Sequence, residues 1–280
     1  MGTMDISLKQ KAGNRWWRGF WQILKGELSR WFGTRRWIVQ IVIYGLLIIP
    51  TVLLILDKPD TRIVGDGQII TVNHRAEGIE FFNAVQGIVG VVGVTILMEG
   101  AILGEKRSGV SAWMLSKPVS RSAYLVAKLV GNSIGVFVCI ILSQGAIAFM
   151  IFNNKLAQPP NLGTMVIAML PQMINLFFYL SLTTMLASIF NHRGIVIAIP
   201  ILPLFTDELL VASITPETLT ILSKILPFGL TTGYNEQFPA IAKSIMMGTQ
   251  PYSLEPLYWI SVISFLFIGI ALYAFHKLQL

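Results

Sequence analysis

The segment at residues 104–128 carries side chains suited to binding another protein. It opens with the charged group at Glu105, and an apolar stretch containing Trp113 and Leu115 follows, long enough for two helical turns. A short apolar helix can dock into a groove of a soluble partner, with charged residues at its ends setting its register. The segment therefore predicts a helix-in-groove contact.

The end of this segment has the residues expected at a helix start. Pro118 interrupts the apolar stretch, and Ser120 and Arg121 follow it. A serine side chain can accept a hydrogen bond from a free backbone N–H group in the first turn of a helix. We expect Ser120 to cap the helix that leads into the next apolar run.

Catalytic and cofactor patterns were not found in the chain. Gly104 and Gly109 have the spacing of a phosphate-binding loop, but Val110 and Ser111 follow in place of Lys and Ser/Thr. The histidines lie far apart in the sequence, at His74, His192 and His276. The single cysteine, Cys139, lies in an apolar run. We expect no enzymatic activity, and no cofactor or metal bound by this chain.

The composition indicates a membrane protein. Of the 280 residues, 54% are apolar and 12% are charged, whereas a soluble domain has about 25% charged residues. So few charges cannot cover a water-exposed globule of this size. A soluble enzyme, a disordered chain and a disulfide scaffold are excluded, and a polytopic all-α membrane protein is favoured.

Six apolar runs are long enough to cross a bilayer, which takes about 20 helical residues. The predicted spans are residues 37–56, 82–103, 124–152, 162–190, 195–214 and 257–276. The fifth is the weakest, because it contains Pro200, Pro203, Asp207 and Glu208.

The loop charges fix the predicted orientation. With the N-terminus inside, fifteen of the 21 Lys and Arg residues lie on the inner side, as the positive-inside rule requires. Both termini are therefore expected in the cytoplasm, with the protein in the plasma membrane (the inner membrane of a prokaryote). The excess Lys and Arg residues behind the net charge of +7 are then expected to lie at the inner membrane surface, and no nucleic-acid partner is expected.

A helix is expected before the first span. Aromatic and aliphatic residues recur there at intervals of three and four, at Trp16, Trp17, Phe20, Trp21, Leu24, Leu28, Trp31 and Phe32. Basic and polar residues, including Arg18 and Lys25, occupy the rest of the helical wheel. Such a helix is either a general membrane anchor or an elbow helix that also braces a cytoplasmic partner.

Two further features have more than one interpretation. Glu99 lies in the second span, near its cytoplasmic end. It is either a functional acid within the membrane or, as we expect, a side chain that reaches toward Lys106 or Arg107. Gly131 and Gly135 have the spacing that lets helices approach closely. They predict either packing within the chain or part of a dimer interface.

The segment at residues 104–128 resembles the pattern of the ABC-2 type permeases, the membrane subunits of a class of ATP-driven transporters. The matching positions in this chain are Glu105, Gly109, Leu115, Pro118, Ser120, Arg121 and Lys128, with Trp113 in the apolar helix. Val110 stands where the family usually has threonine. The resemblance covers essentially the whole chain and implies that these residues couple it to an ATPase subunit.

The resemblance also implies a domain organisation. It divides the chain into a cytoplasmic N-terminus with an elbow helix (residues 1–36) and a six-span transmembrane domain (37–280). Within the latter it implies a cytoplasmic coupling loop (104–123) and an outer re-entrant helical hairpin (215–250). The alternative for the last region is a folded outer loop without membrane contact.

The implied function is that of a transporter permease subunit. A separate ATP-binding-cassette ATPase would bind ATP and Mg and drive a substrate outward. Its other partners would be membrane lipid and a second permease, identical or related. The alternative is a non-transporting scaffold that recruits a cytoplasmic partner. An intramembrane enzyme would need paired acids, histidines or a Ser/Lys dyad at matching depth, and we find none.

Overall fold

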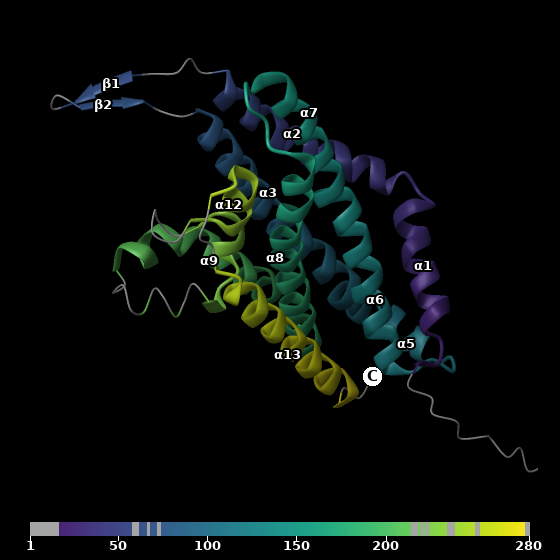
Figure 1. Cartoon of the computed structure of the whole chain (residues 1–280). Coiled ribbons are helices and arrows are strands. Elements are labelled where there is room, and N and C mark those ends of the chain that lie inside the picture. Colours follow the sequence, from purple (N-terminus) through teal and green to yellow (C-terminus); the bar gives the residue numbers. More distant parts are fainter. Residues whose placement is uncertain are drawn as a thin grey trace, which may run out of the picture.

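The computed structural model is a bundle of long helices (Figure 1). It describes residues 17–57, 62–65, 68–71, 74–213, 218, 221, 224–233, 239–249 and 253–277. Three single helices are long and apolar enough to cross a membrane: α2 (Arg36–Leu56), α8 (Leu162–Ile189) and α13 (Glu255–Lys277). Each lies within a few residues of a predicted span.

Two further candidate spans are composite helices. The first, Arg75–Arg107, comprises most of α3 (His74–Glu99), the π-helical turn η2 (Gly100–Gly104) and α4 (Glu105–Arg107). The second, Arg121–Lys155, comprises α6 (Arg121–Val136), the π-helix η3 (Phe137–Leu142) and α7 (Ser143–Lys155). The described residues therefore contain five candidate spans.

The weak fifth predicted span corresponds to α9 (Arg193–Ser213). This helix includes Pro200 and Pro203, and its apolar described part is only Arg193–Leu204. That length is below the number of residues a bilayer crossing requires. The five candidate spans confirm a polytopic, predominantly α-helical architecture, while a total of six spans stays a prediction.

A β-hairpin is an addition to the predicted all-helical fold. Strands β1 (Arg62–Gly65) and β2 (Gln68–Thr71) pair antiparallel, with Ile63 opposite Ile70. They project from the bundle at the end opposite to α5 (Val110–Leu115) (Figure 1). The sequence did carry a signal, since two β-branched runs flank the Asp66-Gly67 dipeptide typical of two-residue turns.

The region predicted as an outer hairpin is described only in part. Two short helices are present, α11 (Phe228–Thr231) and α12 (Ile241–Met247), and α12 buries Ile241 and Ile245. Residues 215–217, 219–220, 222–223 and 234–238 of this region lie outside the described residues, so the re-entrant hairpin stays a prediction.

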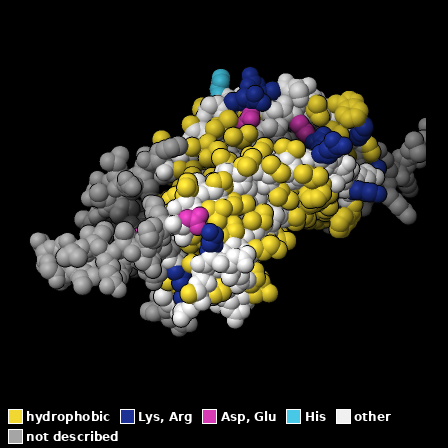
Figure 2. Space-filling view, turned by 90° about the horizontal axis from the view of Figure 1, so that it is seen from above, with side chains coloured by type: hydrophobic (Ala, Val, Ile, Leu, Met, Phe, Trp, Pro, Cys, Tyr) yellow, Lys and Arg dark blue, Asp and Glu magenta, His cyan; other side chains and the backbone are white. Residues whose placement is uncertain are grey.

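The core is built around α8, which packs against α3, α12 and α13. Its hydroxyl residues are satisfied within the helix; Thr184, for example, donates to the carbonyl of Leu180 at 2.6 Å. Hydrophobic side chains cover a broad, continuous area of the face shown in Figure 2. Such a surface suits contact with lipid rather than water.

Candidate functional site

Trp113 is the most exposed large apolar side chain of helix α5, followed by Val110 at its start. Gly109 precedes it with a φ of 76°, a backbone conformation that glycine adopts without strain. Trp113 is 60% exposed, and the ammonium of Lys117 lies 3.7 Å from the centre of its ring. Leu115, by contrast, packs against the core. The outward face of α5 is therefore carried mainly by Trp113.

The segment after α5 is fixed to the region around α1 (Phe20–Phe32). Ser120 caps α6 as predicted, because its hydroxyl accepts from the backbone N–H of Ala123 at 3.1 Å. Its own backbone N–H donates to the carbonyl of Arg18 at 3.1 Å. A Cβ on Gly19 would lie 2.8 Å from Val119. The start of α1 and the end of the loop thus form one close contact.

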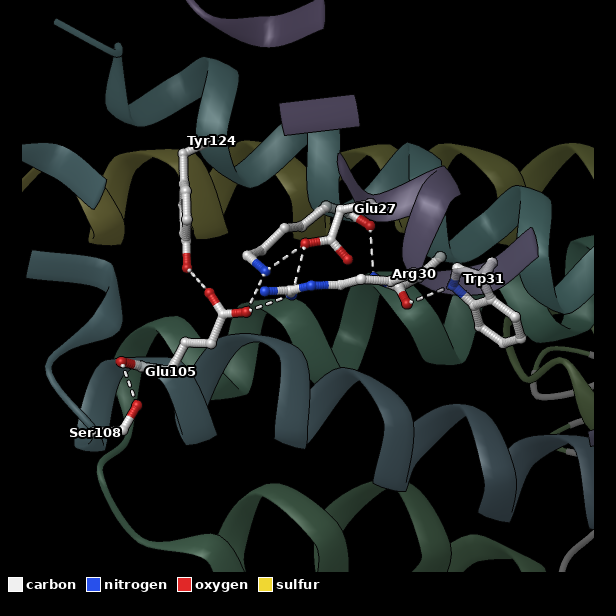
Figure 3. Close-up of polar contacts among 8 residues, drawn as sticks. Glu27, Arg30, Trp31, Glu105, Ser108 and Tyr124 are labelled. Carbon is white, nitrogen blue, oxygen red and sulfur yellow. Dashed lines mark hydrogen bonds and ion pairs between the residues drawn. The ribbon is translucent and has the colours of Figure 1, made fainter. Parts of the chain in front are cut away.

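A charge cluster with a buried centre joins α1, α4 and α6 (Figure 3): Lys128 and Glu27 are buried, whereas the Arg30 side chain is 54% exposed. The Nζ of Lys128 donates to Oε1 of Glu27 at 2.8 Å and to Oε1 of Glu105 at 2.7 Å. Arg30 donates to the same two oxygens, at 3.1 and 2.9 Å. The hydroxyl of Tyr124 donates to Oε2 of Glu105 at 2.8 Å. We call these five residues the charge cluster.

Burial makes the pairing within the charge cluster essential. Lys128 is 1% exposed and Glu27 is 5% exposed, and a buried charge is tolerated only when it is paired and hydrogen-bonded. Two carboxylates face two cations, so the cluster is neutral overall. The hydrogen bond to Glu105 raises the pKa of Arg30 above its ordinary value, so this guanidinium stays charged.

Gly131 and Gly135, the glycine pair predicted to allow close helix packing, lie against α1 and not against another span. A Cβ on Gly135 would lie 2.2 Å from the ring of Trp31, and one on Gly131 would lie 2.7 Å from Glu27. Trp31 is fully buried, and its Nε1 donates to Oδ1 of Asn132 at 3.1 Å. Close approach at these glycines therefore sets α1 against α6 and places Glu27 beside Lys128.

The predicted elbow-helix residues divide between two faces. Leu24 is buried against the bundle and Phe20 packs at its edge, whereas Trp17 is 55% and Trp21 is 76% exposed. Trp16 lies outside the described residues. Part of the predicted apolar face of α1, at Leu24 and Trp31, therefore packs on α6, and Trp21 stays exposed beside it. Contact of this face with the membrane stays a prediction.

Arg121 contacts the end of α13. Its Nη1 donates to the carbonyl of His276 at 2.9 Å. Cationic side chains commonly satisfy the free carbonyls at a helix C-terminus. Arg121 thereby ties the start of α6 to the end of α13. Pro118 is exposed and contributes the turn between α5 and α6.

The predicted partners of Glu99 were wrong. Glu99 pairs with Arg193, the first residue of α9, and not with Lys106 or Arg107; its Oε1 lies 2.7 Å from Nε of Arg193. Arg193 is far away in the sequence, so helical spacing could not reveal this pair.

Glu27 and Arg30 were also missed as site residues. Glu27 lies four residues from Ile23 and four from Trp31, so it shares the buried face of α1. A lone carboxylate on an apolar helical face was the signal that could have identified it.

A family model described as ABC-2 family transporter protein matches residues 21–277. No curated protein matches the chain.

Proposed function

Because this chain belongs to the ABC-2 family of transporter proteins, we propose that it is the permease subunit of a complex with a separate ATP-binding-cassette ATPase. The ATPase binds ATP with Mg and hydrolyses it. The permease moves a substrate outward through the plasma membrane, paired with a second copy of itself or a related chain. Membrane lipid surrounds its spans.

The observation that carries this proposal is the connection between the exposed Trp113 and the charge cluster. Trp113 stands on α5 and is 60% exposed. The helix immediately before α5 contains Glu105, which is bonded to Lys128 of α6 and Arg30 of α1. A force applied to α5 therefore reaches two composite spans and α1 together. A loop that only recruited a partner would not need this connection.

ATP hydrolysis distinguishes the roles of the two subunits. The purified chain alone is expected to hydrolyse no ATP, because its sequence has no phosphate-binding loop. The complex isolated with its ATPase and placed in liposomes is expected to hydrolyse ATP. Hydrolysis by the rigorously pure chain would contradict the subunit assignment. Failure of any ATPase to co-purify would favour the scaffold function instead.

The proposed orientation gives a labelling prediction. After Cys139→Ala, single cysteines are introduced at Ser29 in α1 and at Ala157, which follows α7; both positions are exposed. In intact cells an impermeant maleimide is expected to label Ala157→Cys. Ser29→Cys should react only after permeabilisation, since α1 and α5 lie together at the proposed cytoplasmic end. The reverse pattern would overturn the topology.

A further inference from the structure

A second ion pair joins α3 and α9 at the end of the bundle near α5. Glu99 is the last residue of α3 and is 4% exposed, and Arg193 begins α9. The Arg193 side chain is 57% exposed, so it can be hydrated without Glu99. The buried carboxylate has no such alternative. The pair therefore holds α9 against α3.

A π-helical turn lies between this ion pair and the charge cluster. The turn η2 spans Gly100–Gly104, with Glu99 directly before it and Glu105 directly after it. The guanidinium of Arg193 lies along it: Nε binds Glu99, and Nη2 is 3.9 Å from the position of a Cβ on Gly104. Single π turns inside helices are rare and occur frequently at functional sites.

The geometry of such a turn makes it a possible hinge. Conversion of a π turn to regular α-helix changes the register by one residue, a rotation of about 100° and a rise of about 1.5 Å. Because Lys128 and Arg30 hold Glu105 in place, this rotation would turn the side chain of Glu99 about the helix axis. Glycines at both ends of the turn lower its resistance to rearrangement.

We infer that Glu99 and Arg193 form a latch between α3 and α9, and that η2 is the hinge through which movement of the loop releases it. The hinge part rests on the proposed function, since an ATPase must move the loop. Glu99 and Arg193 are positioning residues. Release lets α9 separate from α3 and opens a route between these helices at the end of the bundle near α5.

The latch can be tested on the chain alone. Spin labels are placed at Ile96 on α3 and Ile199 on α9, two exposed positions on the helices that the ion pair joins, after Cys139→Ala. Arg193→Gln is expected to lengthen the distance between the labels by about one helical turn, roughly 5 Å. The double variant Glu99→Gln/Arg193→Gln leaves no unpaired buried charge, so it should keep the wild-type melting temperature and still show the longer distance. Distances equal to wild type in the double variant would overturn the latch.

The hinge is tested in the complex with the ATPase, using the same labels. Without nucleotide the distance should be short, and trapping with ATP and vanadate should lengthen it. Gly100→Ala should make this change smaller, because alanine favours regular helix over glycine by up to about fivefold in the equilibrium constant and so populates the released state before nucleotide binds. The Cβ of alanine would meet nothing within 4 Å at this position. Gly269→Ala in α13, where the space is equally open, serves as the control and should respond like wild type.

The outcomes separate the two proposals. The hinge would be overturned if the label distance in Gly100→Ala changed with nucleotide as much as in wild type. It would also be overturned if the label distance in the assembled wild type were the same with and without nucleotide. If no ATPase assembles with the chain, the proposed function and the hinge fail together. The latch is still decided by the isolated chain.

Discussion

Lys128→Met is expected to lower the stability of the chain by about 3–5 kcal/mol, the usual effect of removing one partner from a buried ion pair. Lys128 is 1% exposed and donates to both Glu27 and Glu105. Methionine fills a similar volume but leaves two carboxylates to share Arg30. Thermal unfolding of the purified chain in nanodiscs measures the loss.

Two further variants make this result specific to the charge cluster. Lys117→Met removes an exposed cation that lies over the Trp113 ring, and it should change stability by well under 1 kcal/mol. Glu27→Gln added to Lys128→Met should recover part of the loss, because Arg30 then faces the single carboxylate of Glu105. Wild-type unfolding of Lys128→Met would contradict a structural role for the cluster.

Trp113→Asp is expected to weaken binding of the ATPase subunit by about 30-fold or more. Exposed tryptophans in docking sites commonly contribute about 2 kcal/mol or more to binding, and an unpaired carboxylate in a desolvated groove adds a further penalty. The affinity of purified ATPase for the chain in nanodiscs measures the effect. The chain itself should fold normally, since Trp113 is 60% exposed.

The choice of position matters for this test. Leu115→Asp would disturb packing as well as binding, because Leu115 contacts the core, so it is the poorer probe. Lys155→Asp, placed on α7 beside Asp57, lies at the other end of its composite span and should leave ATPase binding unchanged. If Trp113→Asp binds the ATPase as tightly as wild type, α5 does not form the docking contact.

The sequence predicted the features that depend on local composition and spacing. Long apolar runs located the five candidate spans, because the bilayer thickness sets a minimum helix length. The cap at Ser120 followed from its position before a helix. The family pattern marked Glu105 and Lys128, which lie in the charge cluster.

The features that depend on packing between distant segments were not predictable in this way. Glu27 meets Lys128 only because Gly131 and Gly135 let α1 approach α6 closely. Arg121 binds the end of α13 and Glu99 binds Arg193, and both partners are remote in sequence. Helical periodicity shows which face is apolar, but it does not show which helix covers that face.

The most direct test of the account is photo-crosslinking from position 113 in native membranes. A benzophenone amino acid replaces Trp113, and the cross-linked peptides are identified by mass spectrometry. The same amino acid at Ala157, beyond the far end of α7, is the matched control. The account predicts cross-links from position 113 to an ATP-binding-cassette ATPase and none from position 157. Cross-links from position 113 only to lipid, or to proteins without an ATPase domain, would contradict it.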